Sequence, residues 1–454
     1  MKRLKLDTAL PVVFLLLTSF VLGFHAQDVG ASQGDFRVWL QSLQRLPERL
    51  DSIGRGVPSS ERTTLPLIDT YSSVMLRLQE DYYGEKIDER ELTYDAIRGV
   101  LHALGDPFTR FLDPEEYKKM REENEGNFTG IGAQLGTNKK GEVYIVEPLE
   151  DTPAFAAGLK KSDVITAVDD RPVADLPIDD VVKMIRGPEG TQVKLTLSRP
   201  GRSTPFDVVI TRRLVQYKMV KWNWADEKNK IGYIRLYQFN EKSDEQFDKA
   251  LVMLEKDRLR GLILDLRGNP GGLLQVAVDI GSRFIESGPI VIIQERGGRK
   301  NPLYVDEDKH NHGRYPLAVL VDNRSASASE IVSGAIKDTD TGTLVGVKTF
   351  GKGRVQTITP LQDGSAVAIT TAKYLTPKGT DIHKKGIDPD VVIEQPDAEE
   401  ILKQYGLEES DDVDLSDPKY DVQLAKAIDV VKVKLGLLPK TALEAPAKSA
   451  KAGN

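Results

Sequence analysis

The chain of 454 residues is long enough for about three domains of ordinary size. Its hydrophobic (40%) and charged (29%) fractions are those of a soluble globular protein. A formal net charge of −7 argues against nucleic acid as the main partner, because phosphate binding requires a basic surface. The chain contains no cysteine, which excludes disulfides, thiolate metal sites and thiol catalysis. We expect no metal and no other cofactor.

The N-terminus has the pattern of an export signal. Three basic residues among the first five precede an uncharged stretch at 8–24, and polar residues follow. The length of this stretch lies between that of a signal-peptide core and that of a minimal membrane-spanning helix. Residues 1–26 are therefore predicted to be either a cleaved signal peptide or a retained membrane anchor. In both cases we expect the protein in the cell envelope, in a periplasmic or extracytoplasmic position.

Residues 27–119 have a helical pattern. Apolar residues recur three or four positions apart at 67–78 and again at 97–104. Gly105 and Pro107 predict the end of the second of these helices. We therefore expect an N-terminal helical region.

Residues 120–203 change to short strands and glycine turns. A segment of roughly 80 residues is large enough to fold on its own. The predicted strands lie at 131–135, 143–146, 164–168 and 193–198, with a helix at 179–185.

Residues 204–395 alternate between strands and helices. This alternation predicts an α/β core, in which helices cover a layered, largely parallel sheet. The predicted strands are 231–236, 261–266, 317–321, 344–347, 355–359 and 366–372, and the predicted helices are 244–258, 272–285 and 329–337.

A C-terminal helical region is predicted at 396–438, with its last helix at 422–435. The Ala-, Lys- and Pro-rich tail at 439–454 is expected to be disordered.

Ser327 opens the helix that follows the strand at 317–321. Together with Glu330 it matches a capping box, in which the serine only caps the helix. Alternatively, the hydroxyl lies at a helix N-terminus, where free backbone N–H groups can hold a developing oxyanion. Ala328 would supply one such N–H group. This segment alone leaves both interpretations open.

The predicted environment of Lys352 favours the catalytic interpretation of Ser327 over the capping one. It lies between Gly351 and Gly353 in a loop that joins two apolar strands. A free lysine has a pKa of about 10.4, and burial away from anions must lower it to about 7–8 for a base near neutrality. Gln356 is uncharged, so it can orient the amine without raising its pKa. This arrangement favours Ser327 as a nucleophile that the Lys352 amine activates.

A phosphate-loop pattern overlaps this segment. The residues from Gly346 to Lys352 match G-x-x-x-x-G-K. Gly353, however, stands where a serine or threonine must hold magnesium, so we exclude nucleotide binding.

A third element is the glycine-rich turn at 264–272, with the sequence LDLRGNPGG. Glycine and proline suit a plain turn between a strand and a helix. The other interpretation is a second oxyanion N–H group, donated by Gly271 or Gly272. Sites at the carboxyl ends of parallel strands are the rule in α/β sheets.

These three segments, in this order, resemble the C-terminal processing (tail-specific) peptidases, which are serine proteases with a Ser–Lys dyad. The resemblance covers about residues 71–394 and includes the motifs at 104–109, 374–379 and 386–390. It implies an α/β protease core with an inserted PDZ domain and helical N- and C-terminal segments.

By this resemblance Ser327 is the nucleophile, Lys352 is the general base and Gln356 is the residue that orients the base. The oxyanion hole would be formed by Ala328 and either Gly271 or Gly272.

Two positions depart from the family pattern. Arg324 stands where the family more often has glycine, and Arg354 is bulkier than usual in the base loop. Both could alter subsites, but neither touches the dyad.

Residues 120–203 resemble a PDZ domain, and the segments at 153–159 and 187–190 look like bacterial PDZ elements. The strand after the carboxylate-binding loop would take a peptide as an added strand. Arg186 is either a solvated cation, which we favour, or a salt-bridge partner of the substrate or the protease part. The loop that captures a peptide C-terminal carboxylate would be Gly130, Ile131, Gly132 and Ala133.

The hypothesis that follows is an exported serine endopeptidase. It would recognise protein C-termini through its PDZ domain and cleave through an acyl-enzyme. The alternative is a non-catalytic PDZ adaptor with a degenerate protease fold. A trypsin-like PDZ protease is excluded, because the chain lacks the G-[DN]-S-G-G motif. Beyond protein substrates, an activating adaptor, membrane anchoring and a homodimer through the terminal helices are left open.

Overall fold

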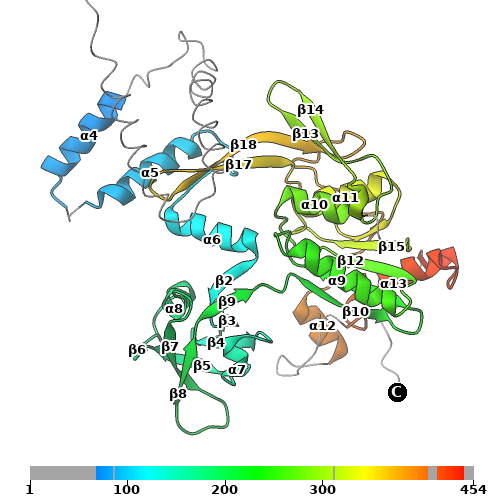
Figure 1. Ribbon diagram of the computed structural model, residues 1–454, viewed down its shortest axis with the longest axis horizontal. Coiled ribbons are helices and arrows are strands. Elements are labelled where there is room, and N and C mark those ends of the chain that lie inside the picture. Colours follow the sequence, from blue (N-terminus) through cyan, green and yellow to red (C-terminus); the bar gives the residue numbers. More distant parts are fainter. Residues whose placement is uncertain (1–67, 85–86, 310–311, 407–416, 444–454) are drawn as a thin grey trace, which may run out of the picture. The chain divides into compact units, whose positions relative to one another are not determined.

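The computed structural model describes residues 68–84, 87–309, 312–406 and 417–443 (Figure 1). The chain divides into two compact units, and the boundary lies between Glu89 and Arg90. The predicted export segment at 1–26 lies outside the described residues. Within the part described, no helix has both the length and the apolar character needed to cross a membrane. In the first unit the structure describes helix α4 (Ile68–Asp81).

The segment before the PDZ domain is not entirely helical. Helix α5 (Glu89–His102) ends before the predicted Gly105 stop, and helix α6 (Pro114–Glu125) follows. Between them lies β1 (Arg110–Leu112), which pairs antiparallel with β18 (Ala366–Leu375). The N-terminal helical region predicted at 27–119 thus also contains a short strand. Three residues are too few to show a strand period, and only the tertiary pairing reveals this strand.

The PDZ domain is built around a sheet with the strand order β3-β4-β5-β7-β8. Strand β8 lies beyond residue 203, where we placed the end of the domain, yet it pairs with β7 along its length. Helix α8 (Ile178–Ile185) packs its buried Val181 and Ile185 onto this sheet. The strands are β3 (Ala133–Thr137), β4 (Val143–Pro148), β5 (Val164–Val168), β7 (Gln192–Ser198) and β8 (Phe206–Thr211).

The protease core contains a six-stranded sheet in the order β10-β11-β12-β15-β16-β19. All neighbours from β11 to β19 are parallel, and only β10 is antiparallel. The predicted, largely parallel sheet is thus confirmed. The strands are β10 (Val220–Asp226), β11 (Ile231–Leu236), β12 (Gly261–Asp265), β15 (Leu317–Val321), β16 (Thr343–Gly346) and β19 (Val391–Val392).

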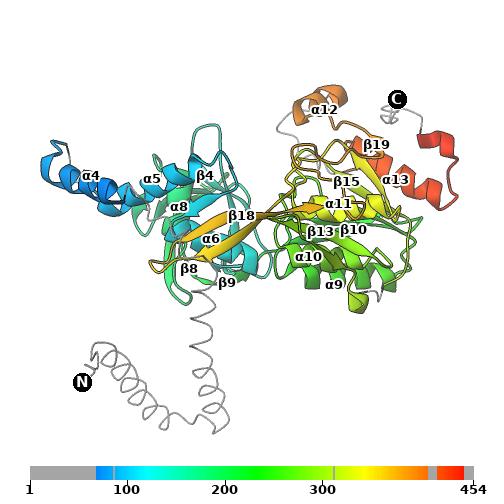
Figure 2. The ribbon, with the colours of Figure 1, turned by 90° about the horizontal axis from the view of Figure 1, so that it is seen from above.

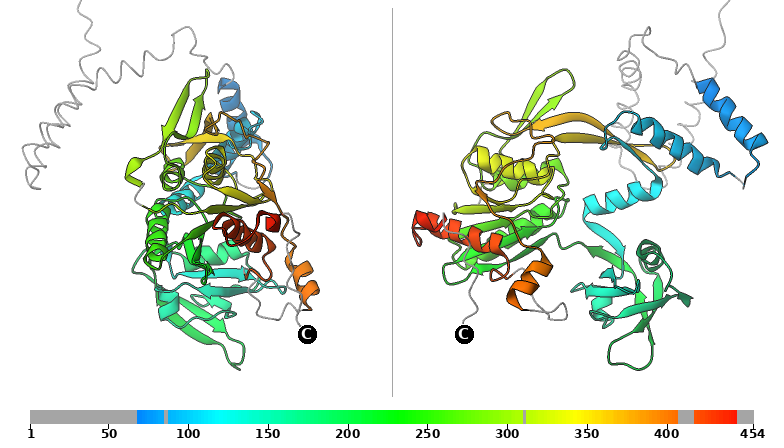
Figure 3. Two further views of the ribbon diagram at one scale, coloured as in Figure 1. Left: turned by 90° about the vertical axis from the view of Figure 1, so that its right-hand side faces the viewer. Right: turned by 180° about the vertical axis from the view of Figure 1, so that it is seen from behind.

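Both faces of this sheet are buried, because successive strand residues point to opposite sides. Ile234 and Leu236 contact one cluster, which includes α9 (Ser243–Lys256), α10 (Leu274–Ser282) and α11 (Ala328–Asp338). Ile231 and Tyr233 of the same strand belong to a second cluster, which includes residues of the C-terminal helix. Figures 1 and 3 show the two helical layers on either side. The C-terminal helix is α13 (Val422–Lys434).

A second, antiparallel sheet flanks the core in the order β1-β18-β13-β14, with β17 (Arg354–Pro360) also paired to β18. Strand β13 is Pro289–Glu295, and β14 is Lys300–Tyr304. The loop that carries Lys352 therefore leaves the parallel sheet at β16 and enters the antiparallel sheet at β17. The long β18 runs out from the core in Figure 2.

The start of the predicted disordered tail is ordered. Residues Lys440–Leu443 form a 3-10 helix, and Leu443 packs against the cluster that contains α13. One apolar side chain with a buried partner is sufficient to order this short segment. Residues 444–454 lie outside the described part. Helix α12 (Ala398–Tyr405) is a further helix of the C-terminal region.

Candidate active site

Ser327 has a backbone conformation that non-glycine residues rarely adopt, with φ 56° and ψ −113°. Such strain is worth about 1–3 kcal/mol and persists only where the surroundings enforce it. Here the Ala326 amide donates to the Asn269 carbonyl oxygen (3.1 Å), and the Ser329 hydroxyl donates to the same oxygen (2.9 Å). The turn from β15 into α11 is therefore fixed on both sides of the serine.

The backbone, not the Ser327 hydroxyl, makes the bonds of the first helical turn. The Ser327 amide donates to Glu330 Oε2 (3.0 Å), as in a capping box. The Glu330 amide, however, donates to the carbonyl oxygen of Ser327 (2.8 Å), although the side chain is close. Among the described residues the Ser327 hydroxyl has no hydrogen-bond partner of good geometry. The capping box predicted for Ser327 and Glu330 is therefore present, and the hydroxyl is not held by a separate side-chain hydrogen bond.

The Glu330 carboxylate joins the serine turn to the lysine loop. It is fully buried and accepts hydrogen bonds from Thr349 Oγ1 (2.6 Å), the Gly351 amide (2.7 Å) and the Lys352 amide (2.8 Å). With the Ser327 amide, these bonds make one buried carboxylate the common acceptor of both segments. From the sequence, Glu330 was identified only as a member of the capping box. The signal that could have revealed its further role is an acidic residue inside a helix of mostly apolar and small residues.

Burial depresses the pKa of the Lys352 amine, and the neighbouring Arg110 guanidinium depresses it further. The Asp106 and Glu330 carboxylates act weakly in the opposite direction. The amine lies 5.0 Å from the centroid of the Phe108 ring. The pKa of Lys352 is therefore shifted in the direction that a general base requires, although the amine rests against an aromatic ring.

A cavity of about 470 Å³ contains Ser327, Lys352, Gln356 and Gly272 in its wall, and we call it the serine–lysine cavity. The Gln356 amide donates to Thr370 Oγ1 (3.3 Å). Within the described residues there is no hydrogen bond from Lys352 Nζ to Ser327 or to Gln356. The structure thus brings the three predicted residues to one cavity, but it does not show the hydrogen bonds expected between them.

The tyrosine of the 374–379 motif supports both backbone segments. The Tyr374 hydroxyl lies 3.1 Å from the Ser327 carbonyl oxygen and within hydrogen-bond distance of the Lys352 carbonyl oxygen. Tyr374 also lines the serine–lysine cavity. It therefore supports the same pair of segments that Glu330 joins.

The two candidate oxyanion glycines differ in their bonding. The Gly271 amide donates to Asn269 Oδ1 (2.9 Å), whereas the Gly272 amide has no partner among the described residues. The Ala328 amide is likewise unbonded within that part of the chain. At Gly271, where φ is 104°, a Cβ would lie 2.7 Å from the Cβ of Ser327. The turn thus requires glycine at 271 for space and leaves the N–H of 272 available.

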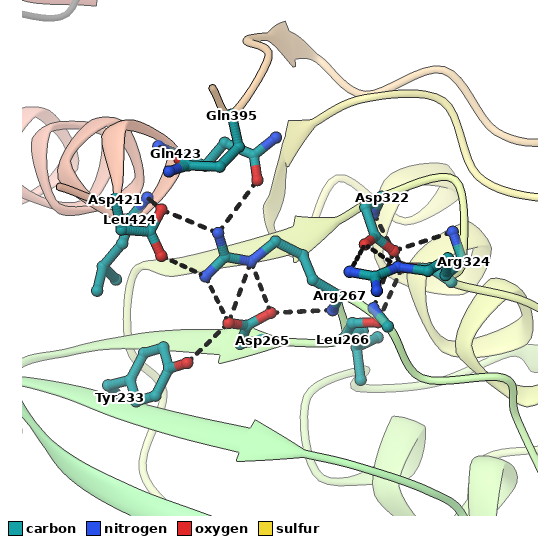
Figure 4. Close-up of polar contacts among 12 residues, drawn as sticks. Tyr233, Asp265, Leu266, Arg267, Asp322, Arg324, Gln395, Asp421, Gln423 and Leu424 are labelled. Carbon is teal, nitrogen blue, oxygen red and sulfur yellow. Dashed lines mark hydrogen bonds and ion pairs between the residues drawn. The ribbon is translucent and has the colours of Figure 1, made fainter. Parts of the chain in front are cut away.

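Behind this turn lies an ion-pair network that sequence analysis missed (Figure 4). Arg267 pairs with Asp265 (2.6 Å) and with Asp421 at the N-cap of α13 (2.7 Å). The Tyr233 hydroxyl donates to Asp265 (2.7 Å). These carboxylates raise the pKa of Arg267 against the effect of burial. The C-terminal helix is therefore bonded to the LDLRGNPGG segment.

Asp322 braces the same segment from the side of β15. Its carboxylate accepts a hydrogen bond from the Gly268 amide (2.9 Å) and pairs with Arg324 (3.0 Å), as Figure 4 shows. Arg324, one of the two departures from the family pattern, thus lies beside the turn and outside the wall of the serine–lysine cavity.

The predicted carboxylate-binding loop of the PDZ domain has its carbonyl groups bonded inward. The Ile131 carbonyl oxygen accepts from the Ala154 amide (2.7 Å), and that of Gly132 accepts from the Leu149 amide (2.9 Å). Within the described residues the amides of Ile131 and Gly132 have no partner. The loop enters β3 at Ala133, and β3 is an edge strand with only β4 beside it.

Gly130 and Arg186, two further residues of this region, make contacts with other elements of the chain. Gly130, the first residue of the predicted loop, is the last residue of β2 (Asn127–Gly130) and pairs with Arg213. Arg186 forms a salt bridge with Glu122 of α6 (2.9 Å), so the favoured interpretation of a solvated cation is wrong. The side chain also lies over the Phe128 ring, 5.3 Å from its centroid.

Comparisons with known proteins agree with this architecture. Residues 230–393 match peptidase family S41, and residues 129–210 match the PDZ domain family. The carboxy-terminal-processing protease of Bartonella bacilliformis is 36% identical over 82% of this chain and 90% of that protein. The carboxyl-terminal-processing protease of Synechocystis sp. is 40% identical over 70% of this chain and 75% of that protein. The solved structure of the photosystem II D1 C-terminal processing protease is 35% identical, covers 71% of this chain and 89% of that chain, and has a TM-score of 0.43.

The fold and these matches define a serine peptidase with an α/β core and a PDZ domain. The chain belongs to peptidase family S41, among the carboxy-terminal processing proteases. The alternative of a non-catalytic adaptor is not favoured.

Proposed function

We propose that Ser327 and Lys352 are the catalytic dyad of this C-terminal processing protease. The observation that carries the proposal is the Glu330 carboxylate, which accepts hydrogen bonds from the amides of both residues, while both side chains line one cavity. A base and a nucleophile fixed through one buried group have the preorganisation that catalysis requires.

In the proposed reaction the neutral Lys352 amine accepts the proton of Ser327 Oγ as this oxygen attacks the scissile carbonyl carbon. The amides of Ala328 and Gly272 stabilise the oxyanion. The peptide C–N bond then breaks, and the Lys352 ammonium protonates the leaving amine. Water hydrolyses the acyl-enzyme by the same route, and the hydroxyl of Ser327 is restored.

The dyad needs two side-chain adjustments from the described conformation. We infer that the Lys352 side chain moves from the Phe108 ring toward Ser327, and that Gln356 exchanges its bond to Thr370 for one to the amine. Both changes are side-chain rotations. Binding of a substrate chain to the edge of β3 and the 130–133 loop is the proposed event that accompanies them.

The test uses the full chain with Ser327→Ala and Lys352→Ala. Each substitution should abolish cleavage of an unfolded protein and leave binding of a peptide C-terminus intact. Ser203→Ala and Lys300→Ala change exposed residues outside the cavity and should cleave normally. Proteolysis that persists in both cavity variants overturns the assignment. Peptide binding by a wild type that cleaves nothing would instead support the adaptor alternative.

An envelope location is proposed on the pattern of residues 1–26 alone, and cell fractionation with N-terminal sequencing tests it. Membrane anchoring and an activating adaptor remain proposals of the same kind. A homodimer is supported by the exposed apolar side chains of Val100 on α5 and of Leu104 just beyond the end of that helix. Light scattering of the purified chain, with Leu104→Gln as comparison, decides that point.

A further inference from the structure

The serine–lysine cavity has a charge opposite to that of the chain. Arg110, Lys352 and Arg354 line it, and neither Asp nor Glu is among the described residues in its wall. The chain as a whole has 69 acidic and 62 basic residues. Positive charge is therefore concentrated in the cavity where the substrate must lie, although the chain as a whole has a net negative charge.

Among the described residues neither arginine of the cavity forms an ion pair at contact distance, although the charge of Arg354 acts on the Asp381 carboxylate. Arg110 makes no ion pair within the described residues, and Arg354 reaches only the Gly353 carbonyl oxygen, at 3.5 Å. Other arginines of the core are paired, as Arg267 is with Asp265 and Arg283 with Asp244. Arg110 is exposed and Arg354 is half-buried, so both guanidinium groups are open to a ligand, and a carboxylate is the group that they bind in paired hydrogen bonds.

The two side chains are held by rigid elements on opposite edges of one strand. Arg110 begins β1 and lies opposite Ala368 of β18, whereas Arg354 begins β17 and lies opposite Lys373. These β18 positions are roughly 17 Å apart at 3.3–3.4 Å per residue. The arginines therefore occupy separate parts of the cavity, on a scale that a short extended peptide spans.

Lys352 does not add a third positive charge to those of Arg110 and Arg354 when it acts as the base. The proposed reaction requires Lys352 to be neutral when it accepts the serine proton, and burial lowers its pKa in that direction. The guanidinium groups remain charged at every relevant pH. During catalysis the cavity is thus left with two fixed positive charges.

We propose that Arg110 and Arg354 form a cationic subsite that selects substrates with a carboxylate close to the scissile bond. This inference rests on the proposed function of Ser327 and Lys352 and adds a substrate class to it. The carboxylate is either the side chain of an Asp or Glu or the chain terminus of a peptide that is cut near its end. Planar guanidinium groups bind both through paired N–H···O bonds.

The experiment uses quenched fluorescent peptides that the full-length enzyme cuts at one mapped bond. Glu or Gln is placed singly at each of the three positions on either side of that bond. A parallel pair has a free or an amidated C-terminus, which separates a side-chain carboxylate from a terminal one. The measured quantity is the ratio of kcat/KM between the charged and the neutral peptide of each pair.

Wild type, Arg110→Gln, Arg354→Gln and Arg299→Gln are compared. Arg299 is an exposed arginine outside the cavity, paired with Glu295, and provides the matched loss of one charge. Because each ratio is taken within one variant, a general loss of activity or of folded protein does not affect it.

Wild type should favour the charged peptide by about fivefold at one position at least, since a partly exposed ion pair is worth such a factor. The preference should shrink at about 0.5 M salt. It should fall toward unity in Arg110→Gln or Arg354→Gln and persist in Arg299→Gln.

A ratio near unity at every position in wild type overturns the subsite, as does a preference that survives both cavity substitutions. Cleavage of the neutral peptides by wild type and not by Ser327→Ala would then show that the proposed function stands without it. A wild type that cuts no peptide contradicts the proposed function, and the inference fails with it.

Discussion

Asp421 Oδ2 lies 2.7 Å from Arg267 Nη2, and this ion pair joins the N-cap of the last long helix to the segment that carries the candidate oxyanion glycines. Both side chains are nearly buried. A charge pair in such a place is weak evidence for stability but strong evidence for a fixed geometry, because an unpaired partner would be left buried. The geometry that it fixes is the turn from Arg267 to Gly272.

Asp421→Asn should lower kcat with little change in KM, because it loosens the turn from Arg267 to Gly272 and leaves the rest of the serine–lysine cavity intact. The asparagine can still cap α13 through the Leu424 amide, so the helix should persist. The free energy of unfolding should fall by about 2 kcal/mol, as for a lost charge-assisted hydrogen bond. Peptidase kinetics and urea unfolding measure the two effects. Asp417→Asn, at an exposed turn, should change neither, and equal kcat in both variants would refute this role for Asp421.

Glu330→Gln should reduce kcat by about a hundredfold or more, because in either orientation the new NH2 group replaces an oxygen that accepts from at least one backbone amide. The serine turn and the lysine loop would then lose their common acceptor. Affinity for a peptide C-terminus, measured by fluorescence polarisation, should stay unchanged. The control is Glu399→Gln, an exposed acid in the first turn of α12. Normal turnover by Glu330→Gln would show that the carboxylate is dispensable.

Activity should rise with pH along one limb that reports the deprotonation of Lys352. Arg110→Gln removes a neighbouring positive charge that favours the neutral amine, so the pKa of Lys352 should increase. The limb of kcat/KM should therefore move to higher pH in this variant. Initial rates on a neutral peptide across the pH range give the result. A limb at the wild-type pH would mean that Arg110 does not act on the base.

Ser327→Gly should be more stable than Ser327→Ala, although both are expected to be inactive. The φ of 56° at this position is costly for any residue with a Cβ and not for glycine. The difference in the free energy of unfolding should be about 1 kcal/mol in favour of glycine. Chemical denaturation of the two proteins under the same conditions is sufficient. If alanine is equally stable, the turn is not strained in solution.

Gly132→Ala should impair the PDZ domain alone. At Gly132 φ is 79°, and a Cβ would lie 2.3 Å from the Cβ of Thr152. The loop must then shift, and affinity for a peptide C-terminus should fall about tenfold or more. A variant at Gly141, which also has positive φ but open space around it, separates backbone strain from the clash. Unchanged affinity in Gly132→Ala would remove this loop from the binding site.

Local patterns predicted the elements that lie wholly in the parallel sheet. Strands 231–236 and 317–321 were predicted with the bounds that the structure has. The segment LAVLV is an unbroken apolar run, as expected of a strand buried on both faces, and in IGYIRL only Arg235 is charged. The short β1 and the hairpin of β13 and β14 were missed. Strands β1 and β13 pair with β18, which is distant in the sequence, so no local pattern indicates that pairing.

For the candidate site, too, local motifs predicted some of the residues, and contacts between distant segments revealed the others. Ser327, Lys352 and Gln356 were identified from motifs, and all three line one cavity. The role of Glu330 as a common acceptor was hidden because its capping signature is genuine and local. The pairing of Arg267 with Asp421 spans more than 150 positions, so only the folded chain could reveal it.

The ion pair between Arg267 and Asp421 also bears on how the enzyme is made. Synthesis proceeds from the N-terminus, so the serine and the lysine leave the ribosome well before α13 does. Until that helix emerges, Arg267 has only Asp265 as an ion-pair partner. The turn from Arg267 to Gly272 then lacks its bond to the C-terminal helix. Proteolytic competence would therefore arrive with the last helix, which spares the nascent chain and the machinery around it.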